Sequence, residues 1–238
     1  MALFWNRKSD IGDKKSDIGD KKSDIQNHNH GDLVSSRSLF LTFSRLRDII
    51  YISQEEYINQ GGNLQMNIIY KDILIRNAID TDAAQLASWW NDGSVMAHAG
   101  FPNGVNTNEE RIKEQIKNYT DAHRVLMIEY KGKAIGEMNY EFSDVDRCEI
   151  GIKICDSAYQ EKGLGRVILT LFIEELFKMG AKTIFLTTNL NNKRAQHVYE
   201  KLGFKKIRID YDSWTNQLGK LQSTVVYELK EEELISFK

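Results

Sequence analysis

The sequence predicts an α/β domain built around a mixed β-sheet, and three observations support this fold class. Residues 148–204 read as a strand, a glycine-rich turn, a long helix, a second strand and a second helix, an order typical of parallel strands joined by a helical connection. Residues 125–154 contain three strand-like segments separated only by short turns, which predicts an antiparallel meander. The residues from Met66 onward have the size of one domain.

The first 65 residues differ in composition, and we expect them to form a disordered extension that precedes a domain at 66–238. A seven-residue repeat carries the motif Lys-Ser-Asp-Ile at positions 8–11, 15–18 and 22–25. Each repeat offers one apolar residue, and Gly12 and Gly19 interrupt any helix, so a coiled coil is not predicted. Two interpretations stay open: Met66 is the functional start of the protein, or the extension binds a partner.

The domain itself can be divided into elements from its hydrophobic patterns and capping residues. Thr81 is the expected N-cap of the first helix, and Thr107 or Asn108 starts the second. Before the glycine-rich turn we expect a strand at 72–76, helices at 82–90 and 108–119, and strands at 125–130, 133–142 and 148–154. After it we expect a helix at 164–179, a strand at 183–188, a helix at 193–202, and final strands at 204–211 and 224–229.

The turn at residues 160–166, Gln-Glu-Lys-Gly-Leu-Gly-Arg, is a candidate anion-binding site because it lies where a strand ends and a helix begins. Backbone N–H groups at a helix start lack intrahelical partners and lie at the positive end of the helix dipole, so phosphate oxygens bind there. Gly163 and Gly165 let the backbone approach a ligand, and Lys162 and Arg166 add positive charge. A glycine pair alone also suits an ordinary tight turn.

A second motif follows the next strand. Its pattern is N-x-x-A-x-x-x-Y-x-x-x-G-F, formed by Asn192, Ala195, Tyr199, Gly203 and Phe204. Together with the Q-x-x-G-x-G of the preceding turn, it resembles the GNAT superfamily of acyl-CoA-dependent N-acetyltransferases. The resemblance covers residues 71–229 and points to the branch that includes ribosomal-protein N-terminal acetyltransferases and polyamine or aminoglycoside acetyltransferases.

The resemblance implies a twisted sheet that splays between its fourth and fifth strands, with helices on both faces. Acetyl-CoA would enter the splay, its pantetheine pairing with the exposed backbone of the fourth strand and its pyrophosphate with the turn. No metal is expected. The residues expected to bind acetyl-CoA are Ile152, Lys153, Ile154, Gln160, Lys162, Gly163, Leu164, Gly165, Arg166 and Asn192.

Direct acetyl transfer to an amine needs three groups, and the resemblance assigns two of them. Negative charge that develops on the thioester oxygen needs a hydrogen-bond donor, for which the backbone N–H of Ile152 is the candidate. The leaving thiolate needs a proton, and Tyr199 matches the tyrosine that supplies it in the family. The position of Tyr199 also suits a core residue packed on its helix.

The third group is a base, because an alkyl amine with a pKa of ~10.4 is almost fully protonated at neutral pH. Glu149 is the first candidate, because it starts the fourth strand, where the resemblance implies a carboxylate that acts on the amine through water. It also alternates with Gly151 and Lys153 on the less apolar face. A solvated strand glutamate is an equally good interpretation, and Glu137 is the second candidate.

The sequence also predicts whether two histidine and two tryptophan side chains are buried or exposed. His98 and His123 lie in or beside loops with no neighbouring carboxylate partner in the sequence, so we expect both at the surface. Adjacent helical residues point about 100° apart, so one of Trp89 and Trp90 is expected in the core and the other exposed toward the acceptor.

The acceptor is a primary amine whose identity the sequence leaves open. Five acidic residues gather on the third and fourth strands and their turn, which favours a cationic acceptor such as a polyamine, an aminoglycoside or a protein N-terminus, or else a solvated hairpin. They are Glu137, Glu141, Asp144, Asp146 and Glu149.

Composition narrows the class of partner. The formal net charge is −2 at pH 7 and the basic residues are dispersed, so nucleic-acid binding is not predicted. Neither cysteine belongs to a C-x-x-C motif and no apolar run is long enough to span a bilayer, so we expect a cytoplasmic protein without membrane contact. A monomer and a homodimer are both consistent with the sequence.

The alternative function is a non-catalytic sensor that binds acyl-CoA. The presence of both Tyr199 and Asn192 argues against this alternative.

Overall fold

The structure is a computed structural model, and it describes residues 65–238. The expected disordered extension lies outside the described residues, apart from residue 65. Met66 is already part of the fold, since its side chain is buried and its backbone N–H donates to Asn77 Oδ1 at 3.2 Å. The division into an extension and a domain at 66–238 stays a prediction.

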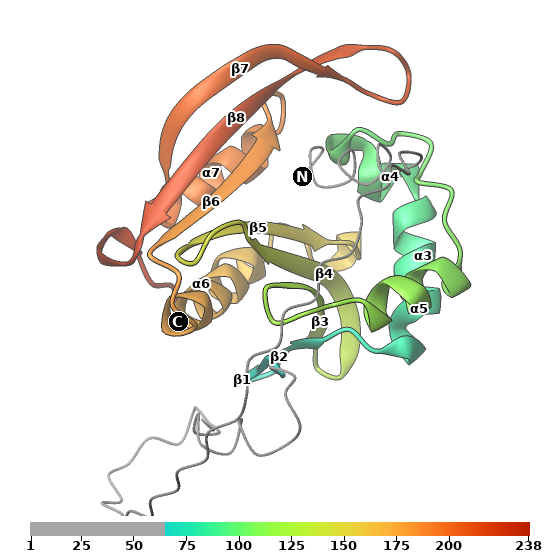
Figure 1. Ribbon diagram of the computed structural model, residues 1–238, viewed down its shortest axis with the longest axis horizontal. Helices are drawn as coiled ribbons and strands as arrows, with labels where there is room; N and C mark the ends of the chain where they lie inside the picture. The colour runs from blue at the N-terminus through green and yellow to red at the C-terminus, as the bar shows by residue number, and fades with distance from the viewer. Residues whose placement is uncertain (1–64) are drawn as a thin grey trace, which may run out of the picture. The chain divides into compact units, whose positions relative to one another are not determined.

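The described residues form one eight-stranded mixed sheet in the order β1-β2-β3-β4-β5-β6-β8-β7 (Figure 1). All neighbouring strands are antiparallel except β5 and β6, which are parallel. The expected mixed sheet is confirmed. Its strands are β1 Asn67–Tyr70, β2 Ile73–Asn77, β3 His123–Tyr130, β4 Lys133–Phe142, β5 Arg147–Ile154, β6 Thr183–Asn189, β7 Lys205–Thr215 and β8 Leu221–Lys230.

The helices fall into groups on different sides of the central strands (Figure 1). The shorter helices α3, α4 and α5 lie together on one side, whereas the long helix α6 lies across the other side of β4 and β5. The helices are α3 Ala83–Asn91, α4 Gly93–Met96, α5 Glu109–Lys117, α6 Leu164–Lys178 and α7 Lys193–Lys201. Short 3-10 helices occur at Asp80–Asp82, Ala97–Ala99, Ser157–Tyr159 and Glu231–Glu233.

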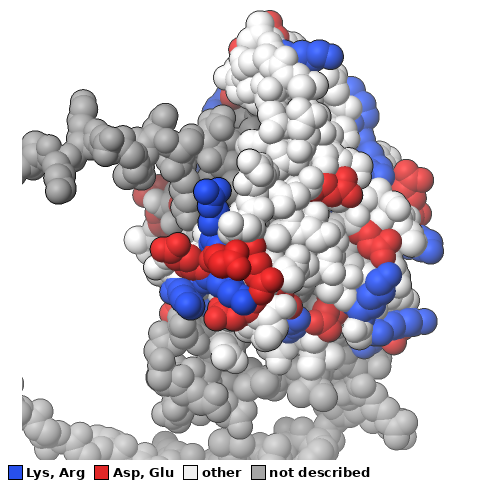
Figure 2. Space-filling view, turned by 90° about the vertical axis from the view of Figure 1, so that its right-hand side faces the viewer, with Lys and Arg blue, Asp and Glu red and all other residues white. Residues whose placement is uncertain are grey.

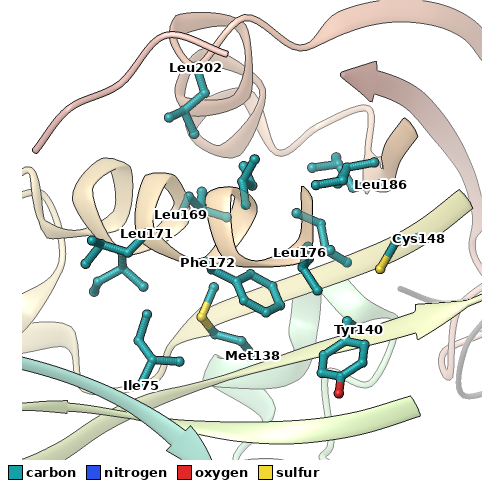
Figure 3. Close-up of a cluster of buried hydrophobic side chains, with 14 of the residues drawn as sticks. Ile75, Met138, Tyr140, Cys148, Leu169, Leu171, Phe172, Leu176, Leu186 and Leu202 are labelled. Carbon is teal, nitrogen blue, oxygen red and sulfur yellow. The ribbon is translucent and has the colours of Figure 1, made fainter. Parts of the chain in front are cut away.

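Helix α6 is apolar because it is packed on both of its sides. Figure 3 shows Phe172 lying toward Met138 and Tyr140 of the sheet, while Leu169 lies on the side of α7, where Leu202 is. Four of these side chains are fully buried and Leu169 is nearly so. A helix buried on one face only would show a polar stripe, so the mostly apolar sequence of α6 agrees with burial on both sides.

Two element predictions differ from the structure. Strand β1 was not expected; it pairs with β2 across a tight turn at Lys71, which has a φ of 51°, and lysine is not a residue that signals such a turn. Thr81 is wrong as an N-cap, because it lies inside a 3-10 helix and Asp82 precedes α3. The Asp82 carboxylate instead accepts hydrogen bonds from Arg76, at 2.7 and 2.9 Å.

Candidate active site

Strands β5 and β6 separate after a short parallel contact, and this fork is the main feature of the candidate site. Residues 147–149 of β5 lie opposite residues 183–185 of β6, and no further pair forms. Beyond Glu149, β5 stays paired with β4 as far as Ile154, and β6 stays paired with β8 as far as Asn189. Within the described structure, one edge of β5 is therefore without a strand partner from Ile150 to Ile154. The splay expected between these two strands is confirmed.

The direction of the β5 backbone can be read from its flanking hydrogen bonds. The carbonyl of Asp146 accepts from Thr183 N at 3.0 Å, so it points toward β6, and the carbonyl of Arg147 accepts from Ser143 N at 3.0 Å, so it points toward β4. Because successive residues direct their N–H and C=O groups to opposite edges of a strand, every second residue after Asp146 faces the β6 side. By this alternation the N–H and C=O of Ile152 point to the open edge.

The far end of this open edge is occupied by a glutamine side chain. Gln160 Nε2 donates to the carbonyl of Ile154 at 2.7 Å, and its Oε1 accepts from Arg194 Nη1 at 2.9 Å. Gln160 thus ties the end of β5 to the first turn of α7. Lys153, by the same alternation, turns its backbone toward β4, and its side chain lies on the other face of the sheet in contact with Glu137.

The glycine-rich turn forms the start of α6. Gly163 is the N-cap residue, with a left-handed φ of 79° that disfavours any side chain. A Cβ atom added at Gly163 or Gly165 would find its nearest neighbours at 3.8 and 3.7 Å, and both are side-chain atoms. The backbone at this helix start, including Leu164, is therefore open to an approaching ligand, as an anion-binding site requires.

Two cations flank this helix start without being neutralised. Lys162 Nζ lies 5.8 Å from the ring centroid of Tyr159, and Arg166 Cζ lies 4.7 Å from that of Phe237. Neither side chain forms an ion pair with a carboxylate of residues 65–238. Uncompensated positive charge beside free helical N–H groups favours binding of a phosphate or pyrophosphate.

Asn192, expected to bind acetyl-CoA, is the N-cap of α7. Its side-chain oxygen accepts from Ala195 N at 3.2 Å. This bond satisfies one of the unpaired N–H groups at the helix start. The structure therefore gives the Asn192 carbonyl oxygen a capping role.

Tyr199 lies one to two turns later in α7 and is buried. Its ring centroid is 5.8 Å from that of Phe204 and 5.9 Å from that of Tyr227. Burial raises the pKa of Tyr199 to about 12, so its phenol remains protonated at neutral pH. Among residues 65–238 its hydroxyl group has no hydrogen-bond partner.

The two candidate bases share the sheet face that lies opposite α6. In the register of β4 and β5, Glu141 lies opposite Glu149 and Glu137 lies opposite Lys153. Glu149 is partly exposed and is the last β5 residue paired with β6, so it lies at the fork. Glu137 is 1% exposed, with Oε1 2.5 Å from Lys153 Nζ and Oε2 buried without a hydrogen-bond partner among the described residues.

The histidines and tryptophans differ in part from expectation. His98 is exposed, as expected. His123 is partly buried and meets Tyr119 edge to face at 5.2 Å. Trp89 and Trp90 are 8% and 2% exposed, so the expectation that one of them faces an acceptor is wrong. Helix α3 packs against α5, and the carbonyl of Trp90 is tied to the following loop by a 2.8 Å bond from Val105 N, so both flanks of the helix are covered.

The acidic cluster is partly neutralised by neighbouring lysines. Glu137 pairs with Lys153, and Asp146 pairs with Lys182 at 3.3 Å. On the face that carries α3 and α5, acidic and basic side chains of the described residues are interspersed in small groups, and no extended patch of one sign is seen (Figure 2).

Two features are absent from residues 65–238. No group of three or more histidine, cysteine or carboxylate side chains lies close enough together to hold a metal ion. No helix in this part of the chain combines the length and the apolarity needed to cross a bilayer.

Comparison with known proteins was made by family, by sequence and by structure. The sequence model described as an acetyltransferase (GNAT) domain matches residues 72–205. The ribosomal protein bS18-alanine N-acetyltransferase of Escherichia coli K12 is 43% identical over 54 residues, which are 23% of this chain and 36% of that protein. The chain thus matches only about a third of the length of the first curated relatives.

Two solved structures show the same fold at low sequence identity. The spermidine N-acetyltransferase of Vibrio cholerae, in complex with CoA and spermine, has a TM-score of 0.62 and 17% identity, over 68% of this chain and 97% of that one. The ribosomal-protein-S5-alanine acetyltransferase of Vibrio fischeri has a TM-score of 0.60 and 17% identity, over 71% of this chain and 99% of that one. Because the family match also extends over more than half of the sequence, the protein belongs to the GNAT acetyltransferase family.

Proposed function

We propose that the protein transfers an acetyl group from acetyl-CoA directly to a primary amine. The observation that carries this proposal is the fork between β5 and β6, which leaves the β5 edge open next to the free N-terminus of α6. An extended pantetheine can pair with an unpaired strand edge, as peptides do with exposed sheet edges. A pyrophosphate can bind the adjacent helix start. One site thus offers both kinds of contact that acetyl-CoA needs.

The residues of the site fit acetyl-CoA in distinct ways. The backbone of Ile152 and Ile154 would bind the pantetheine amides, and Lys153 lies between them in the strand. The helix start from Gly163 to Gly165, with Lys162 and Arg166, would hold the pyrophosphate. Gln160 is held between Ile154 and Arg194, so its proposed role is to fix the spacing between these two parts.

When bound, acetyl-CoA supplies an activated thioester carbonyl. The amine nitrogen forms a bond to this carbonyl carbon, and the carbon–sulfur bond breaks. The N–H of Ile152 donates to the oxygen as negative charge develops there. Glu149, directly or through a water molecule, accepts the proton that the amine loses. Tyr199 gives its proton to the leaving thiolate, so the products are an amide and free CoA thiol.

The acceptor is proposed at the level of a primary amine. The E. coli relative acts, by its name, on an alanine of ribosomal protein bS18, and the V. cholerae structure contains spermine. Glu141 and Glu149, opposite each other near the fork, supply negative charge that favours a cationic amine. A cytoplasmic location, independence of metal ions, and a monomeric or homodimeric state belong to the same proposal.

The test is release of CoA thiol from acetyl-CoA by the full chain, measured with polyamines, aminoglycosides and peptides bearing free N-termini. We expect thiol release that depends on one of these acceptor classes and saturates with it. Tight acetyl-CoA binding without release with any amine would contradict the transferase and support a sensor. Absence of acetyl-CoA binding would reject the site itself.

A further inference from the structure

The last residues of the chain lie along α6 and are held there by specific contacts. The backbone N–H of Phe237 donates to Thr170 Oγ1 at 3.2 Å, and the Thr170 hydroxyl donates to the carbonyl of Arg166 at 2.9 Å. Lys238 forms an ion pair with Glu174. Thr170 is completely buried. These bonds link the terminal segment, residues 234–238, to the first three turns of α6.

This arrangement places the Phe237 ring against the guanidinium group of Arg166. The Arg166 Cζ atom is 4.7 Å from the ring centroid, within the range of a cation–π interaction. Arg166 Nη2 is also 3.8 Å from the position that a Cβ of Gly163 would occupy. The guanidinium group therefore lies against the Phe237 ring and close to the N-cap of α6.

We propose that Phe237 is a positioning residue that holds Arg166 ready to bind the pyrophosphate of acetyl-CoA. This inference rests on the proposed function, because it concerns the same anion site. An aromatic ring holds a guanidinium by its face and leaves the N–H groups in its plane free for bidentate bonds to phosphate. A carboxylate in the same place would instead neutralise the charge.

The benefit of such a contact is preorganisation. A free arginine side chain loses rotamer freedom when it binds a ligand, at a cost of roughly 0.5–1.5 kcal/mol. Phe237 restricts the Arg166 side chain before the ligand binds. The entropy of the side chain is therefore lost when the protein folds, and it no longer weakens ligand binding. Since about 1.4 kcal/mol corresponds to a tenfold change in affinity, removal of the ring should weaken acetyl-CoA binding by about twofold to tenfold.

The test compares Phe237→Leu with Phe237→Trp in the full chain, with the dissociation constant of acetyl-CoA measured by calorimetry. We expect Phe237→Leu to weaken binding about twofold to tenfold and Phe237→Trp to retain wild-type affinity, because tryptophan also offers a π face. Ile235→Ala is the matched control: Ile235 lies in the same segment, is 53% exposed and has no proposed part in holding Arg166. Its affinity should equal that of the wild type.

A phosphate-free thioester separates positioning from a general loss of structure. With S-acetylpantetheine as the acetyl donor, Phe237→Leu should have the same kcat/KM as the wild type, since Arg166 has no phosphate to bind. In an Arg166→Met background, Phe237→Leu should cause no further loss of acetyl-CoA affinity. If Phe237→Leu does not fold, as judged by circular dichroism, Phe237→Met keeps apolar volume and takes its place.

The outcomes distinguish this inference from the function on which it rests. Wild-type affinity in Phe237→Leu, or an equal loss with S-acetylpantetheine, would overturn the role of Phe237 while acetyl-CoA binding stands. If Phe237→Leu weakens acetyl-CoA binding just as much in the Arg166→Met background, the role of Phe237 would be overturned as well. Failure of the wild-type chain to bind acetyl-CoA would overturn the proposed function, and the inference with it.

Discussion

Tyr199 shows at the scale of one residue how packing and chemistry combine. Burial raises its pKa to about 12, which keeps the phenol protonated, and its ring packs between Phe204 and Tyr227. Removal of the hydroxyl group alone, in Tyr199→Phe, should leave this packing and the acetyl-CoA affinity unchanged. It should lower kcat by about 10²–10⁴-fold, the usual range for a lost proton transfer, as measured by thiol release.

Tyr227→Phe is a matched control for that variant. The Tyr227 hydroxyl donates to Glu200 at 2.8 Å and belongs to the same aromatic cluster, but it has no proposed part in the reaction. We expect a kcat close to that of the wild type. An unchanged kcat in Tyr199→Phe would remove Tyr199 from the mechanism and leave it as a core residue.

The buried pair of Glu137 and Lys153 is a second residue-scale feature, and it concerns stability. The side chains are 2% and 10% exposed, so loss of one partner leaves a charge in a medium that cannot solvate it. Lys153→Met should lower the free energy of unfolding by about 3–5 kcal/mol, measured by urea denaturation. The double variant Glu137→Leu with Lys153→Met should recover much of this loss. Lys182→Met, which breaks an exposed ion pair, is the control and should change the free energy of unfolding little.

The roles proposed for single residues came from local motifs, and they stay predictions. Gly163 and Tyr199 were singled out because their spacing along the chain is itself the signal. The side-chain contact of Lys153 was not predicted, because it depends on the register of two strands. The contact between Arg166 and Phe237 joins residues far apart in sequence and left no trace in any motif.

At the scale of elements, the start of α6 needs a residue with a left-handed backbone, Gly163, at the same place where the pyrophosphate is proposed to bind. Gly163→Val should weaken acetyl-CoA binding, because a β-branched side chain both disfavours the φ of 79° and blocks approach to the helix start. Gly132→Val is the matched control: Gly132 has a φ of 73° in the β3–β4 turn, with no atom within 4 Å of an added Cβ.

Both valine variants should lose stability by similar amounts in urea denaturation, since the backbone strain is alike. Only Gly163→Val should raise the dissociation constant of acetyl-CoA. Equal affinities in the two variants would contradict the assignment of the pyrophosphate to this turn.

The β7–β8 hairpin is an element whose position the sequence did not predict. Its tip meets the loop after α4: Gln217 Oε1 accepts from Asn103 N, and Gln217 Nε2 donates to the carbonyl of Gly104, each at 2.9 Å. Trp214 lies so close to Gly100 that an added Cβ would be 2.6 Å from its ring. These contacts join segments more than 100 residues apart.

Gln217→Ala should loosen this junction without unfolding the domain. Two hydrogen bonds are lost, each worth about 0.5–1.5 kcal/mol, and the backbone bond from Gln217 N to Gly100 remains. Amide hydrogen exchange should accelerate in residues 100–104 and 213–219, with little change elsewhere. Lys220→Ala, at the same exposed tip, should leave the exchange rates as in the wild type. Uniform acceleration throughout the sheet would contradict a local junction.

At the scale of the whole molecule, the order of strands was the least predictable property. The final two strands were expected as a pair, but the placement of β8 between β6 and β7 depends on long-range pairing that no local pattern encodes. The fork between β5 and β6 was expected only through the family resemblance. Periodicity alone identifies a strand, and it does not tell where that strand loses its neighbour.

The interior as a whole also determines how stability depends on pH. Burial raises the pKa of Tyr199 and of Cys148 to about 12, and it raises the pKa values of Tyr119, Tyr140 and Cys155 as well. In the unfolded chain these groups titrate near their ordinary values of 9.0 for thiols and 10.0 for phenols. Between the two values the unfolded chain holds fewer protons than the native state, so the free energy of unfolding falls as pH rises.

We therefore expect stability that is nearly constant between pH 7 and about pH 8 and decreases from about pH 9 upward. The measurement is the midpoint of urea denaturation at closely spaced pH values from 7 to 11. Tyr199→Phe removes one of the protons held by the native state, so its stability should decline less steeply above pH 10 than that of the wild type. A flat profile would mean that these side chains are accessible to water and titrate at their ordinary pKa values, which would contradict the burial of Tyr199.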